Sequence, residues 1–159
     1  MRKVTILGAA ALVVAAAAAS QGLARPRPAP PLLTPQQVVA ARQAAFGLSA
    51  GVFGNIKGAV DSGADPKPFG FGARNLAKWA AVLPSMFPAG TALPESKAKP
   101  AIWTARADFE AKAAAYAAAA GKLAAAAQAG DKAAFAAAFR ETGGACKACH
   151  DAYRMEEHH

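Results

Sequence analysis

Four large side chains recur every seven residues in the alanine-rich second half of the chain, at Ile102, Phe109, Tyr116 and Leu123. A strict seven-residue repeat of apolar groups places them along one face of an α-helix. Alanine, which fills most of the positions between them, is the strongest helix former. The repeat therefore predicts a long helix whose apolar face has to be covered by other helices.

Three further segments have helical periodicity, and turn-forming stretches at 61–68, 89–100 and 130–131 separate the four. Thr34, Pro35 and Gln37 form a capping-box arrangement that predicts the start of the first helix. Strand signals are absent, so we predict an all-α fold, an antiparallel four-helix bundle. The inward stripe of the first segment comprises Val39, Arg42, Phe46, Ser49, Phe53, Ile56 and Val60. The second carries Leu76, Trp79, Ala80, Leu83 and Phe87, and the fourth carries Phe135, Phe139, Thr142, Cys146, Cys149 and Tyr153.

The first residues have the pattern of a secretory signal peptide, with a basic start at Arg2 and Lys3 and an apolar run over 6–19. Cleavage is expected after Ala24, with Ala19 as the alternative site. The apolar run is short for a membrane span, which needs about 20 residues. We therefore predict a signal peptide at 1–24, a proline-rich leader at 25–33 and a helical domain at 34–159, exported to the periplasm without stable membrane insertion.

The 159-residue chain has a formal net charge of +8, yet no block of five or six like charges marks a binding tail. A basic surface can attract nucleic acid or acidic partners. Export argues against nucleic acid as a partner. The charge is therefore interpreted as a mild basic bias of a solvated surface.

Both cysteines of the chain lie in one short stretch, Cys146-Lys-Ala-Cys149-His150. The C-x-x-C-H pattern is typical of c-type haem attachment. Positions i, i+3 and i+4 share one helix face, so two thiols can add to the haem vinyl groups while the next imidazole reaches the iron. Two alternatives stay open. A disulfide is compatible with export, and a zinc site would need His158 or His159 as its fourth ligand.

The chain resembles the cytochromes c prime, the class II c-type cytochromes, from about Thr34 to Arg154. The resemblance rests on "RQAAF" in the first helix, "MFP" after the second, "KPAIW" before the third, "AAQAGD" before the fourth, and "CKACHDAYR". It implies a four-helix bundle with haem c attached near the C-terminus through Cys146 and Cys149, with His150 as the iron ligand. It also implies a homodimer.

Related low-spin members bind iron on the other side through a methionine four residues after the arginine of the first helix. This chain has Phe46 there, four residues after Arg42. Phenylalanine has no lone pair, so the resemblance implies a five-coordinate, high-spin iron under an apolar wall. Met86 is the remaining thioether candidate, and we interpret it as core packing.

Three polar residues complete the predicted site. A charge on an apolar stripe is costly unless it is paired, and the resemblance gives Arg42 a haem propionate as its partner. Gln43 is predicted to reach a propionate as well. Arg154, one turn after His150, is similar to a family residue near the proximal histidine, which implies that it hydrogen-bonds a proximally bound ligand or polarises the imidazole. The alternative is a cation at the helix C-terminus.

These features predict a binding protein rather than an enzyme. We expect reversible binding of nitric oxide or carbon monoxide, with a role in protection against nitrosative stress. The alternative is a one-electron carrier in a periplasmic respiratory chain, with small redox proteins as partners. A non-haem zinc or disulfide-bonded helical protein is the remaining alternative.

Overall fold

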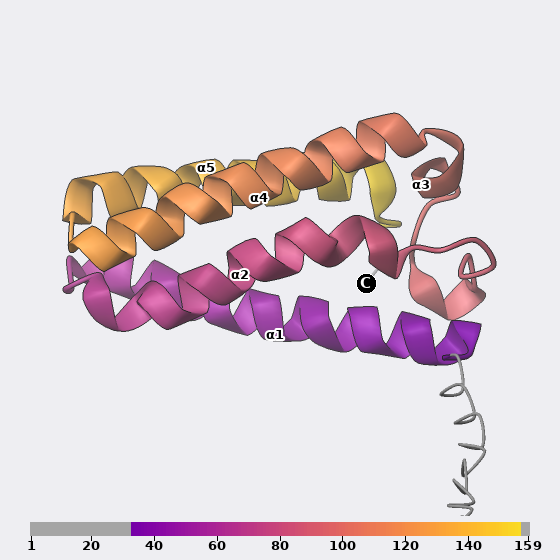
Figure 1. Ribbon diagram of the computed structural model, residues 1–159, viewed down its shortest axis with the longest axis horizontal. Helices are drawn as coiled ribbons and strands as arrows, with labels where there is room; N and C mark the ends of the chain where they lie inside the picture. Colours follow the sequence, from indigo (N-terminus) through magenta and orange to yellow (C-terminus); the bar gives the residue numbers. More distant parts are fainter. Residues whose placement is uncertain (1–32, 157–159) are drawn as a thin grey trace, which may run out of the picture. The chain divides into compact units, whose positions relative to one another are not determined.

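The computed structural model describes residues 33–156, so the expected signal peptide and all but the last residue of the leader lie outside the described part. Four long helices run alternately up and down as an antiparallel bundle (Figure 1), which confirms the predicted fold class. Helix α4 packs against both α2 and α5, and α1 packs against α2 and α5. The helices are α1 (Pro35–Ser62), α2 (Gly70–Val82), α3 (Ala101–Thr104), α4 (Arg106–Ala129) and α5 (Lys132–Tyr153).

The helix ends follow from local sequence. At the start of α1 the Thr34 hydroxyl accepts a hydrogen bond from the Gln37 backbone N–H, and the Gln37 side chain accepts one from the Thr34 N–H. This is the predicted capping box. The side chain of Asp131 caps α5 in the same way through the Ala134 N–H. Gly130 ends α4 with a φ of 74°, a left-handed conformation that favours glycine.

Substitution of two glycines of α4 should change stability in opposite directions. Gly130→Ala forces an L-residue into the left-handed region and should lower the free energy of unfolding by about 1 kcal/mol. Gly121 lies within α4 with nothing within 4 Å of an added Cβ. Gly121→Ala should therefore raise the free energy of unfolding by roughly 0.5–1 kcal/mol, because alanine loses less backbone entropy in a helix. Urea unfolding of both variants measures the two shifts, and shifts of the same sign would contradict this account.

The third predicted segment is not one continuous helix. It breaks at Ala105, whose φ of −113° and ψ of 46° are not helical, and so α3 and α4 are separate helices. The neighbouring side chains are held by the preceding loop, since Arg106 donates to the carbonyls of Pro84 and Phe87. All four residues of the seven-residue repeat are nevertheless buried, at 0–8% exposure.

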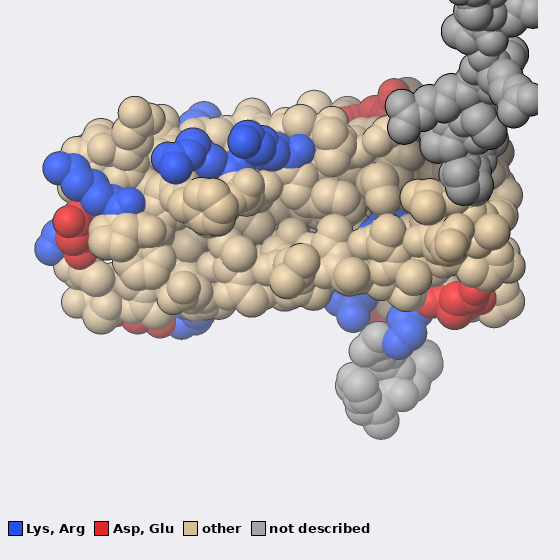
Figure 2. All heavy atoms as spheres, turned by 60° about the horizontal axis from the view of Figure 1, so that its bottom comes forward, with Lys and Arg blue, Asp and Glu red and all other residues tan. Residues whose placement is uncertain are grey.

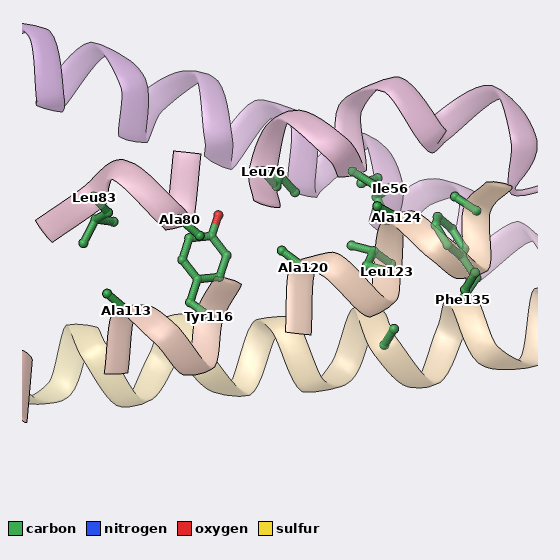
Figure 3. Close-up of a cluster of buried hydrophobic side chains, with 14 of the residues drawn as sticks. Ile56, Leu76, Ala80, Leu83, Ala113, Tyr116, Ala120, Leu123, Ala124 and Phe135 are labelled. Carbon is green, nitrogen blue, oxygen red and sulfur yellow. The ribbon is translucent and has the colours of Figure 1, made fainter. Parts of the chain in front are cut away.

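One half of the bundle is closed by small and aliphatic side chains packed between α1, α2, α4 and α5 (Figure 3). Ile56, Leu76, Leu123 and Phe135 lie at its centre, with exposures of 0–3%. Alanines of α4 line the contact with α2 and α5 and allow these helices to approach closely. We call this region the closed half. Within residues 33–156, no helix combines the length and the apolar character that a membrane crossing requires.

Candidate functional site

The other half of the bundle contains a cavity of about 570 Å³. Cavities of roughly 300–1,000 Å³ are typical of cofactor sites in proteins. Its walls come from α1, α2, α4, α5 and the loop between α2 and α3. The lining is largely apolar and aromatic, and it includes Phe46, Phe53, Trp79, Phe87, Phe109, Tyr116 and Tyr153.

The C-x-x-C-H motif lies on the cavity wall. Cys146, Cys149 and His150 belong to the last two turns of α5, and all three side chains line the cavity. Both cysteines are free thiols rather than a disulfide. The helical spacing expected from the sequence is therefore realised, and it directs three reactive groups into one space.

Burial shifts the pKa of all three groups in the direction that favours their neutral forms. Burial raises the pKa of both Cys146 and Cys149, which keeps the thiols protonated. Burial and the nearby Arg154 lower the pKa of His150, against a smaller opposing effect of Asp151, so the neutral imidazole is favoured. A neutral imidazole is the form that binds iron. In the described part of the chain, no group of three or more His, Cys, Asp or Glu side chains could hold a metal ion.

Arg42 is almost completely buried, at 1% exposure, and it also lines the cavity. Its Nη1 donates to the Thr91 hydroxyl at 2.8 Å and to the Met86 carbonyl at 3.1 Å, and Nη2 donates to the Thr91 carbonyl at 2.8 Å. Its guanidinium also lies 4.2 Å from the centroid of the Phe87 ring. Burial lowers the pKa of Arg42. The arginine thus anchors the loop after α2. A haem propionate as a further partner of Arg42 stays a prediction.

A second loop segment closes one edge of the cavity, and we call residues 95–99 the strap. Gln43 donates to the Glu95 carbonyl at 2.6 Å, so its amide contacts the strap. Ala98 pairs with Arg154 in an isolated antiparallel bridge. The bridge is supported by bonds of 2.9 Å from the Lys99 N–H to the Tyr153 carbonyl and from the Met155 N–H to the Lys97 carbonyl. Gln43 and Arg154 are therefore brought to the cavity rim, where their predicted contacts with haem remain untested.

Aromatic rings surround the cavity in a continuous cluster. Phe46 contacts Trp79 in a T-shaped arrangement and Phe87 in a tilted one, and Phe87 in turn contacts Phe109. Phe109 contacts Tyr153, whose hydroxyl donates to Asp108. That hydrogen bond, with burial, raises the pKa of Tyr153 to about 12. Phe46 thus lines the cavity from α1 and contacts Trp79 of α2, and its role as an apolar wall over the iron stays a prediction.

The sequence did not indicate every residue of the site. Thr91, which holds Arg42, lies in a loop without periodicity, and nothing in its neighbourhood signals burial. Tyr116 was expected only as core, yet it lines the cavity. Met86, the alternative iron ligand, is absent from the residues that line the cavity, and its backbone carbonyl serves Arg42 instead.

Comparison with known proteins finds related sequences that cover most of the helical domain. A family model described as Cytochrome C' matches residues 37–154. The chain is 41% identical over 124 residues to cytochrome c' of Rubrivivax gelatinosus, covering 76% of this chain and 95% of the relative. It is 38% identical over 125 residues to cytochrome c' of Alcaligenes xylosoxydans, covering 77% and 97%.

Solved structures share the bundle as well. A nitric oxide complex of a mutant cytochrome c prime from Alcaligenes xylosoxidans superposes with a TM-score of 0.73 and 36% identity, covering 80% of this chain and all of that one. Cytochrome c' from Thermochromatium tepidum gives a TM-score of 0.73 and 30% identity, covering 78% of this chain and 98% of that chain.

Proposed function

The chain belongs to the cytochrome c' family, whose members carry covalently bound haem c, and we propose that it binds nitric oxide or carbon monoxide at a five-coordinate haem iron. Cys146 and Cys149 are assigned to the two thioether bonds, each formed by adding a thiol S–H across a vinyl double bond. His150 is assigned as the protein ligand of the iron. When bound, haem supplies an iron centre that takes up a small diatomic ligand and exchanges single electrons.

The observation that carries this proposal is the set of side chains facing the cavity. Among the described residues lining it there is no methionine, and His150 is the one histidine. Phe46 and its aromatic neighbours cover the α1 side with groups that cannot ligate iron. Nitric oxide and carbon monoxide tolerate such an apolar surface, whereas binding of oxygen is favoured by strong hydrogen-bond donors. The nitric oxide complex of the similar Alcaligenes xylosoxidans protein supports the same ligand class.

The test is the optical spectrum of ferrous holoprotein produced with the haem-attachment machinery. We expect a high-spin spectrum without added ligand, a change to low-spin with carbon monoxide or nitric oxide, and haem that stays with the chain on acid–acetone extraction. A low-spin ferrous spectrum without gas would contradict the five-coordinate proposal and favour the one-electron carrier with redox-protein partners.

We further propose export to the periplasm and, in the cell, protection against nitrosative stress by reversible binding of nitric oxide rather than by catalysis. The signal-peptide pattern at 1–24 supports export. Deletion of the coding gene should lower growth under nitric oxide but not in its absence. Unchanged growth under nitric oxide would contradict the protective role and leave gas binding to be judged by the spectrum.

The α1 face supports a homodimer. No charged residue occurs in 43–56, and Figure 2 shows few charged side chains across the middle of the face that α1 contributes to. Leu48 of α1 and Phe71 of α2 are 74% and 73% exposed, and they lie close in sequence to Val52 and Gly72, where α1 and α2 approach each other. A contiguous exposed apolar face is typical of an interface.

The dimer proposal predicts the effect of a single charge. Leu48→Arg should convert the holoprotein from dimer to monomer in size-exclusion chromatography with light scattering, because the charge would be buried unpaired. Met155→Arg, which changes an exposed apolar residue at the other end of the chain, should leave the dimer intact. A wild-type protein that is monomeric at all concentrations would refute the proposal.

A further inference from the structure

Trp79 makes the closer of the two ring contacts of Phe46. The centroids of the Phe46 and Trp79 rings are 5.4 Å apart and the planes meet at 87°. The Phe87 ring lies further from Phe46, at 6.4 Å, and is tilted by 53°. An edge-to-face pair of aromatic rings is attractive beyond the area that it buries. The orientation of Phe46 therefore depends more on Trp79 than on Phe87.

The two neighbours of Phe46 also differ in how firmly they are held. Phe87 is fixed by the Arg42 guanidinium and by ring contacts with Trp103 and Phe109. Trp79 has Phe46 as its one ring contact within residues 33–156. A change at Phe87 would disturb the whole cluster, whereas a change at Trp79 acts on Phe46.

No hydrogen bond accounts for the presence of a tryptophan at position 79. Its Nε1 is buried and has no partner in the described part of the chain. The other tryptophan, Trp103, donates from Nε1 to the Pro88 carbonyl at 3.1 Å. Burying an unpaired donor is unfavourable. Independently of this donor, the Trp79 ring lines the cavity and contacts the Phe46 ring.

We propose that Trp79 is a positioning residue that holds the Phe46 ring over the cavity and thereby limits ligand access to small diatomic molecules. Trp79 lines the same cavity as Phe46 and comes from α2, so it supports the ring of α1 from the side. The inference rests on the proposed gas-binding function, but the position of the Phe46 ring can be measured without any gas.

The first test is the crystal structure of ligand-free ferrous holoprotein carrying Trp79→Leu or Trp79→Phe. Leucine removes the aromatic edge, and we expect the Phe46 ring to occupy more than one rotamer or to leave its place over the cavity. Phenylalanine removes the Nε1 donor and part of the ring volume but keeps an aromatic edge, so Phe46 should stay as in the wild type. An unmoved Phe46 ring in Trp79→Leu would overturn the inference. If Trp79→Leu folds poorly, the flexible Trp79→Met takes its place.

The second test is the rate of carbon monoxide binding after flash photolysis. Trp79→Leu should raise the rate about fivefold, equivalent to about 1 kcal/mol, and Trp79→Phe should stay within about twofold of the wild type. In a Phe46→Ala background, Trp79→Leu should add nothing, because the ring it positions is gone. Phe69→Leu, which removes a ring that does not line the cavity and contacts Phe135, is the control and should leave the rate unchanged.

The outcomes separate this inference from the proposed function. Additive effects of Trp79→Leu and Phe46→Ala would show that Trp79 does not act through Phe46. If Phe46→Ala alone leaves the rate unchanged, the role of Phe46 in gas binding fails, and the crystal structures still decide whether Trp79 positions the ring. Unchanged binding in Trp79→Leu alongside a faster Phe46→Ala would refute the role of Trp79 alone.

Discussion

Phe46→Ala is expected to raise the rate of carbon monoxide binding to the ferrous protein about tenfold to a hundredfold. A ligand that enters from the α1 side has to displace the Phe46 ring, which breaks its contacts with Trp79 and Phe87. Each aromatic pair contributes roughly 0.5–1.5 kcal/mol, and each 1.4 kcal/mol is about tenfold in rate. Removing the ring removes this cost before the ligand arrives.

Phe53→Ala is the matched control for this measurement. Phe53 lies on the same helix and lines the same cavity, but its ring stacks on Phe139 at 4.3 Å and contacts neither Trp79 nor Phe87. It should change the rate by less than about threefold, the effect of a single weak aromatic contact. Equal acceleration by both variants would point to general loosening of the cavity instead of a specific ring over the iron.

Arg42→Ala is expected to lower the free energy of unfolding by about 3 kcal/mol. The substitution removes a large buried side chain and leaves two carbonyls and the Thr91 hydroxyl without their donor. Both effects belong to the costly class of core substitutions. Urea unfolding of the holoprotein, followed by helical circular dichroism, measures the loss.

Arg106→Ala provides the comparison, because Arg106 holds the same loop from the other side through the carbonyls of Pro84 and Phe87. Its side chain is 36% exposed, so water can replace it as a donor. The expected loss is about 1 kcal/mol, because hydrogen bonds that water can replace contribute little net stability. If both alanine variants lowered the free energy of unfolding equally, burial would not determine how much each arginine contributes to stability.

The helical architecture and the attachment motif were predictable because each rests on local spacing. The capping box at Thr34 and the seven-residue repeat are each formed by residues close together in the sequence, and the structure contains both. The spacing of Cys146, Cys149 and His150 likewise needs only a helix. The family comparison then confirms haem c as the cofactor.

The remainder depends on contacts between residues distant in sequence. The break at Ala105 interrupts the seven-residue repeat between Ile102 and Phe109. Arg106, the next residue, is held by the carbonyls of Pro84 and Phe87, 22 and 19 residues earlier in the chain. The sequence identified Arg42 as a buried charge that requires a partner, but the partner found in the structure is Thr91, 49 residues later. No local sequence pattern predicts such a pair, and none identifies Trp79 as the neighbour of Phe46.

The closed half has a consequence for how local stability is distributed along the bundle. Ile56, Leu76, Leu123 and Phe135 do not line the cavity, although they belong to the same core cluster as Leu83 and Tyr116, which do. Regions with dense apolar packing open last in native-state hydrogen exchange, and regions around a binding site open first. Amide protection should therefore fall from one end of each long helix to the other. Local opening of the backbone around the cavity should therefore be possible while the other end of the bundle stays folded.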